Sequence, residues 1–278
     1  MNLVSMAANQ RSLRITDAYQ ARLKQVAARV GDLTAARWDL APSDFDGSYS
    51  AWRQVAVEAV SRAQRENLRL TNGYLAAFVA SETGRRIRPP VIDSEKYVGK
   101  SRDGRDLSEA WDSPVIKAKV AISKGKTVEE ASDIAKAAAQ QLVSLDTWHG
   151  ARGPLSEGMT VMVQVEGFTR VPSGESCAAC LAAADGTVFA TDDIFQLHAE
   201  CDCVAEPEVE DVPQAVQRPT GAEMFNELTP AEQAARVGDA AAEAIQDGRI
   251  TLSDLKGHSP MVNEPDWITQ RPLADALK

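Results

Sequence analysis

The chain has 278 residues, enough for one large domain or two modest ones. Hydrophobic residues make up 44%, which allows a packed core and argues against a wholly disordered chain. The formal net charge of −10 argues against a general coat for duplex DNA, because such a coat binds by neutralising phosphates. No apolar run approaches the roughly 20 residues of a membrane span, and the first 14 residues lack the apolar core of a signal peptide. We therefore expect a soluble protein that is not exported.

The charge is unevenly divided along the chain. Residues 1–100 carry 15 basic and 10 acidic groups, whereas residues 101–278 carry 15 basic and 30 acidic groups. This asymmetry predicts two electrostatically distinct parts.

Two long amphipathic helices are predicted in the basic part. Over residues 14–40, apolar side chains recur at steps of three and four, which places them on one face. A similar stripe predicts a second helix from about residue 50 to 79, and Gly84 is a natural stop for it. Residues 84–114 contain several glycines and prolines and are predicted to be irregular.

Further helices are predicted over residues 115–124 and from Thr127 to about Leu145. The second of these opens with a capping box, in which Thr127 and Glu130 satisfy each other's backbone amides. Residues 158–170 are ambiguous, because alternating valines favour a strand whereas the length allows a short helix.

The last quarter of the chain begins with an acidic, proline-containing segment over residues 204–222, which predicts a linker or an extended arm. A helical unit follows, opened by a second capping box at Thr229 and Glu232 and ended by Gly248. One more short capped turn is predicted over residues 251–255.

Several arginines lie on the polar faces of the second predicted helix or just after it. They are Arg53, Arg62, Arg65, Arg69, Arg85, Arg86 and Arg88. Two interpretations remain open: a solvated face, or contacts with nucleic acid or an acidic partner.

All four cysteines of the chain lie between residues 177 and 203. The arrangement is a Cys-x2-Cys pair, seventeen further residues, and then His-x2-Cys-x-Cys. Zinc prefers thiolate and imidazole ligands in a tetrahedron, and two such clusters can supply them. The sequence thus predicts a structural zinc site with five candidate ligands for four places: Cys177, Cys180, His198, Cys201 and Cys203.

Other interpretations of this segment stay open. The cysteines can be reduced thiols packed as small hydrophobes, or they can form one or two local disulfides. His198 and Glu200 with the first cysteine pair contain the ingredients of a zinc hydrolase or deaminase, although the order of the motif is reversed. A zinc module that binds nucleic acid is a further alternative. Four protein ligands would indicate a structural site, and three with an open position a catalytic one.

The same segment resembles a family pattern. GFTRVPSGESCAAC at residues 167–180, DGTVF at 185–189 and HAECDC at 198–203 resemble the MuF-like minor head proteins of tailed bacteriophages. LTPAEQ at 228–233 and GRITLSDL at 248–255 resemble the tail of many actinobacteriophage members. One departure is Leu197, where the family often has tyrosine.

The resemblance implies a structural protein of the phage head and not an enzyme. It also favours a helix over residues 158–170. We expect a mainly α fold with long N-terminal helices, a small α+β Cys/His metal-stapled module and a short helical C-terminal tail. The expected boundaries are 1–150 for the helical region, 151–206 for the module, 207–222 for the acidic linker and 223–278 for the tail. Expected partners are the portal protein, the major capsid protein and packaged DNA, with no membrane and no small-molecule substrate. Its expected location is the virion, and the host cytoplasm during assembly.

Overall fold

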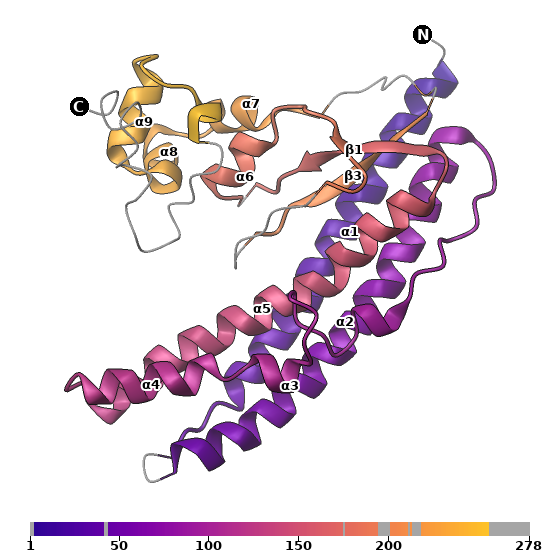
Figure 1. Ribbon diagram of the computed structural model, residues 1–278. Coiled ribbons are helices and arrows are strands. Elements are labelled where there is room, and N and C mark those ends of the chain that lie inside the picture. The colour runs from indigo at the N-terminus through magenta and orange to yellow at the C-terminus, as the bar shows by residue number, and fades with distance from the viewer. Residues whose placement is uncertain are drawn as a thin grey trace. The chain divides into compact units, whose positions relative to one another are not determined.

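The structure, a computed structural model, describes residues 3–41, 44–174, 176–193, 201–210, 212 and 218–255, with side chains from residue 10 onward (Figure 1). The fold is mainly α-helical with one small antiparallel sheet and a cysteine cluster, as predicted. The chain divides into two compact units, residues 12–163 and residues 164–278 together with 1–11.

Long helices build the unit of residues 12–163. They are α1 (Leu3–Ala36), α2 (Phe45–Thr83), α4 (Ser113–Ser123) and α5 (Val128–Val161). The two long helices predicted first are confirmed, although α1 begins and ends earlier and α2 is longer at both ends. Gly84 ends α2 with a φ of 66°, a left-handed conformation that glycine adopts without strain.

The capping box of Thr127 and Glu130 opens α5 as predicted, but the helix continues to Val161, well past Leu145. Gly150 explains part of this. A Cβ atom there would come within 2.7 Å of the Cα of Gln64 on α2, so glycine permits a close helix contact that offsets its low helix propensity. His149 consequently lies inside the helix and not at a helix end, and burial lowers its pKa.

The segment between α2 and α4, predicted to be irregular, contains two short helices, η1 (Ser94–Lys96) and α3 (Leu107–Ala110). The buried amide of Gln64 holds this connection. Its nitrogen donates to the carbonyl oxygens of Lys100 and Asp146 at 2.8 and 2.9 Å, and its oxygen accepts from the amide of Gly99 at 2.7 Å. A fully hydrogen-bonded amide of this kind ties two helices and a loop together.

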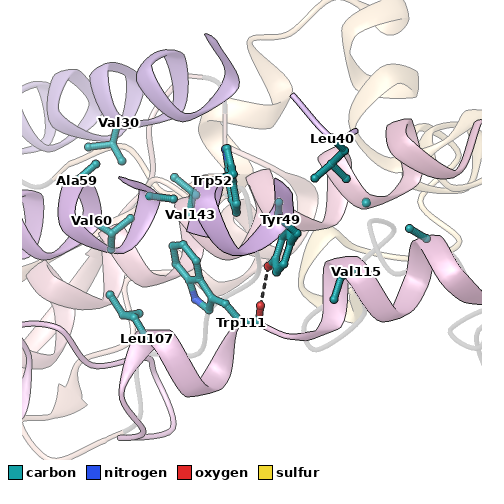
Figure 2. Close-up of a cluster of buried hydrophobic side chains, with 14 of the residues drawn as sticks. Val30, Leu40, Tyr49, Trp52, Ala59, Val60, Leu107, Trp111, Val115 and Val143 are labelled. Carbon is teal, nitrogen blue, oxygen red and sulfur yellow. Dashed lines mark hydrogen bonds between the residues drawn. The ribbon is translucent and has the colours of Figure 1, made fainter. Parts of the chain in front are cut away.

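Aromatic side chains form the centre of the core of residues 12–163 (Figure 2). Trp52 stacks between Tyr49 and Trp111, with ring centroids 5.6 and 6.2 Å away. The Tyr49 hydroxyl donates to the carbonyl oxygen of Trp111 at 2.5 Å, and the Trp111 indole donates to the Asp146 carboxylate at 2.6 Å. Small alanines on α2, α4 and α5 let the helices approach around this cluster.

The sheet belongs to the second unit. Its strands are β1 (Val165–Val171), β2 (Phe189–Ala190) and β3 (Val204–Val209), in the antiparallel order β2-β1-β3. The helix favoured for residues 158–170 is therefore wrong beyond Val161, because the alternating valines form a strand.

Strand β3 also shortens the predicted linker. It runs across the expected boundary at residue 206, and its Glu206 is buried because Arg218 pairs with it in a bidentate ion pair of 2.8–3.2 Å. The sequence concealed this strand, because a buried glutamate and a proline are unusual strand residues until the partner arginine is placed. The two units meet at residue 164 in the chain, not at 151.

Short helices complete this unit. They are α6 (Ala178–Ala183), α7 (Gly221–Asn226), α8 (Pro230–Val237), α9 (Asp239–Gln246) and η2 (Leu252–Leu255). The capping box of Thr229 and Glu232 and the short turn before Leu255 are confirmed. Gly238, with a φ of 83°, divides the single helix predicted up to Gly248 into two. We call residues 218–255 the C-terminal tail from here on.

Candidate metal centre

Three buried sulfur atoms meet at one point. The Sγ atoms of Cys201 and Cys203 are 2.9 Å apart, those of Cys203 and Cys180 are 2.9 Å apart, and those of Cys180 and Cys201 are 3.3 Å apart. A disulfide would need about 2.05 Å, so none of these three sulfur pairs is disulfide-bonded, and the disulfide interpretation is wrong for this structure. The three side chains can together hold a metal ion.

Two segments bring the thiols together. Cys177 is the N-cap of α6 and Cys180 lies one turn later, so both project from the same side of the helix. Cys201 and Cys203 directly precede β3 and are two residues apart in extended chain, which directs both side chains to one face. Half-buried Cys177 packs against the other three cysteines as the fourth member of the cluster.

The surroundings of Cys180 favour its neutral thiol form in the metal-free cluster. Contacts with the Cys177 thiol, then with Cys201 and Cys203, together with burial, raise the pKa of Cys180. Among neutral thiols a thiolate is poorly stabilised, but a bound divalent cation stabilises several at once. Sulfurs around a tetrahedral zinc at about 2.3 Å stand roughly 3.8 Å apart, so ligation needs only an outward shift of roughly 0.5–0.9 Å.

The turn of residues 173–176, just before Cys177, is hydrogen-bonded to Asp202, the residue between the second pair of cysteines. The amide of Ser173 donates to the Ser176 hydroxyl at 2.7 Å, and the amide of Ser176 donates to the carbonyl oxygen of Ser173 at 3.0 Å. Both hydroxyls donate to the carboxylate of Asp202, the residue between Cys201 and Cys203, with Ser176 at 3.0 Å. Asp202 therefore holds the two halves of the site in register, as outer partners of metal ligands do.

The C-terminal tail reaches the same turn through Arg236 on α8. Its guanidinium donates to the carbonyl oxygen of Gly174 at 2.9 Å and to that of Ser176. Sequence reasoning missed both Asp202 and Arg236. Asp202 had one signal, its place between two cysteines, whereas nothing in the sequence connects Arg236 with a turn about 60 residues earlier.

The structure brings together four of the five predicted ligands: Cys177, Cys180, Cys201 and Cys203. The fifth, His198, lies outside the described residues, as does Glu200, which the hydrolase or deaminase interpretation requires.

The predicted contact arginines are partly neutralised within the protein. Arg53 pairs with Asp112 and Arg62 pairs with Glu58. The remaining five are exposed, and no described carboxylate pairs with them: Arg65, Arg69, Arg85, Arg86 and Arg88. For these five arginines a solvated face and a contact surface both stay open.

Comparisons with known proteins give no match to a protein-family model, to a curated protein or to a solved structure. Among the helices of the described residues, none is long and apolar enough to cross a membrane. The functional proposal therefore depends on the chain's own residues and on the pattern that they form.

Proposed function

We propose that this chain is a structural protein of the head of a tailed phage, of the MuF-like kind, whose small module is stapled by one zinc ion. The observation that carries the proposal is the convergence of buried sulfurs from two separate segments, both of which belong to the MuF-like pattern. A metal ion held by thiols from both segments would cross-link the start of α6 to the start of β3.

Burial favours a structural over a catalytic role for the metal. The side chains of Cys180, Cys201 and Cys203 are 0–3% exposed. Cys177 stands beside them, so four sulfurs can close the coordination sphere. A catalytic zinc keeps an open position for water or substrate, which a closed thiolate cage does not provide. Thiolate ligands also favour zinc over magnesium or calcium, which prefer oxygen.

The role in the head is proposed from the sequence pattern and from the division of charge. A protein incorporated in few copies at the portal vertex or inner capsid surface, assisting assembly, packaging or delivery of DNA, needs partner surfaces and no active site. The basic first hundred residues suit contacts with packaged DNA or with an acidic portal surface, and the acidic remainder suits a basic capsid partner.

Metal analysis of the purified chain tests the site. We expect about one zinc per chain, which Cys180→Ser and Cys203→Ser abolish. Ala179→Ser, on the same helix, adds a hydroxyl without removing a ligand and should keep the zinc. A metal-free wild type, or unchanged content in both cysteine variants, would refute the zinc site. X-ray absorption spectroscopy then separates a closed sphere of protein ligands from three ligands and water, which would favour a hydrolase or deaminase.

The role in the phage needs its own experiment. Mass spectrometry of purified virions of the encoding phage should find the chain in few copies, and an amber mutation in its gene should reduce filled heads. Co-expression with the portal or the major capsid protein should yield a complex with one of them. Normal virions that lack the chain would overturn this part while leaving the zinc site intact.

A further inference from the structure

The two sides of helix α6 contact different parts of the protein. Cys177, its N-cap, and Cys180 lie in the thiol cluster. Ala178, Leu181 and Ala182 are buried instead in a core that they share with the C-terminal tail. The tail residues of that core are Phe225, Val237, Ala241, Ala242, Ala244, Ile250, Leu252 and Leu255. One short helix thus carries ligands on one side and the tail's docking surface on the other.

This helix cannot hold its shape without help. It has six residues, and its N-cap makes no side-chain capping hydrogen bond. Isolated helices shorter than about 12–15 residues are marginal in water even with good sequences. The thiol cluster on one face and the tail on the other therefore decide together whether α6 forms.

The tail begins directly against the last turn of α6. The amide of Gly221 donates to the carbonyl oxygen of Ala184 at 2.6 Å. A Cβ atom on Gly221 would lie only 1.8 Å from the carbonyl oxygen of Leu181, so the backbone of α7 contacts the backbone of α6 with no room for a side chain. This contact requires the C-terminal end of α6 to be helical.

Arg236 adds a second link at the other end of α6, through the Ser173–Ser176 turn that Asp202 also holds. Inside the tail, the Gln233 amide nitrogen donates to the carbonyl oxygen of Phe225 at 3.0 Å, and Gln246 donates to Gln233 at 2.9 Å. These bonds join α7, α8 and α9, so the tail docks as one body.

We propose that metal binding at the cysteine cluster and docking of the C-terminal tail are energetically coupled through α6, with Arg236 as a positioning residue for the metal site. The inference depends on the proposed zinc site. With zinc bound, α6 is formed and the tail is docked. Without zinc, α6 loses one of its two supports, the tail detaches, and the apolar side chains of Leu181 and Phe225 become accessible. By reciprocity, a weakened tail contact lowers zinc affinity.

The effect of the tail contact on zinc binding is tested by the zinc affinity of the full-length chain. Competition with a chromophoric chelator measures this affinity. Arg236→Ala should weaken zinc binding about tenfold, the lower range for groups that support metal ligands. Arg236→Lys, which keeps one donor, should recover part of the loss. Arg249→Ala is the matched control, because Arg249 pairs with the neighbouring Asp247 on an exposed segment. Wild-type affinity in Arg236→Ala would refute the role of Arg236.

The effect of zinc on docking of the tail is tested by hydrogen exchange on the wild-type protein, without any substitution. A chelator with a reductant should accelerate exchange in peptides covering residues 221–250, and added zinc should restore the protection. Peptides from α2 serve as the internal reference and should not change. If the chain binds zinc but chelation leaves the tail protected, the coupling is wrong and the zinc site stands. If the wild type binds no zinc at all, both fall together.

Discussion

The two units of this protein are stabilised in different ways. Residues 12–163 rely on helices of up to 39 residues whose aromatic and alanine side chains pack into a large buried cluster. In the described part of residues 164–255, the helices have four to eight residues and the outer strand β2 of the sheet has two. Long elements bury enough apolar surface to stand alone, whereas small ones need a cross-link. The thiol cluster lies where that cross-link is needed.

Metal removal should separate the two units most sharply. Treatment with a chelator and a reductant should unfold the described part of residues 164–255 while the helical unit keeps its melting temperature, because zinc-thiolate binding contributes on the order of 10 kcal/mol. Four of the five tryptophans lie in residues 12–163, so their fluorescence reports mainly the helical unit. Circular dichroism with hydrogen exchange reports the other. Simultaneous loss of both signals would contradict independent units.

The buried ion pair of β3 gives the next largest effect. Arg218→Ala leaves the Glu206 carboxylate, 4% exposed, without its bidentate partner and should cost about 3 kcal/mol in the zinc-bound protein. The control is Arg249→Ala, which breaks an exposed pair and should cost no more than about 0.5 kcal/mol. Chemical denaturation monitored for the second unit measures both, and equal costs would show that burial of Glu206 is unimportant.

The stability of the helical unit should change when a side chain is enlarged in its core, and it should not change when metal is removed. Gly150→Ala places a methyl group against the backbone of Gln64 and should destabilise the unit by about 2 kcal/mol, as overpacking does. Gly31→Ala, on α1 with nothing within 4 Å of the new Cβ, should stabilise by about 0.5–1 kcal/mol. Urea unfolding followed by tryptophan fluorescence compares the two. A stabilising effect of Gly150→Ala would mean that α2 and α5 are not in close contact there.

A smaller effect concerns pH and the buried carboxylate at the centre of the helical core. Burial raises the pKa of Asp146 above its usual value, against hydrogen bonds from Trp111 and Arg102 that lower it. The folded state therefore holds the proton more tightly than the unfolded state. The contribution of Asp146 to stability is greatest below its unfolded pKa and falls as the pH rises through the raised value.

The variant Asp146→Asn isolates this contribution, because it cannot ionise. The free energy of unfolding of the wild type, taken relative to that of the variant, should fall as the pH rises above about 4, the usual pKa of an aspartate. Parallel pH profiles for the two proteins would show that Asp146 does not titrate differently on folding.

Local patterns predicted much of the helical unit. The apolar stripes of α1 and α2, the stop at Gly84 and the capping box of Thr127 are signals within one turn of a helix, and they hold in the structure. The errors come from contacts between distant residues. The close approach of Gly150 to α2 accounts for part of the continuation of α5 past Leu145. Arg218 pairs with Glu206 and so permits a buried glutamate in the strand at residues 204–209.

For the candidate site, too, the sequence predicted the local features and not the contacts between distant residues. The spacing of the cysteines predicted which residues belong together, because a Cys-x2-Cys turn and a Cys-x-Cys pair each fix two sulfurs locally. The support around them was not predictable, because Asp202 bonds to serines 26 and 29 residues away and Arg236 to carbonyl groups 60 and 62 residues away.

By itself, then, the sequence determined the helical class of the protein, the charge division and the identity of the clustered thiols, all of which depend on short-range chemistry. The tertiary structure decided where the units divide, that the acidic segment supplies a strand, and that the C-terminal tail shares a core with the helix bearing Cys180. Those features depend on which residues, distant in the sequence, bury apolar surface against each other. The periodicity of one segment does not specify which other segment it packs against.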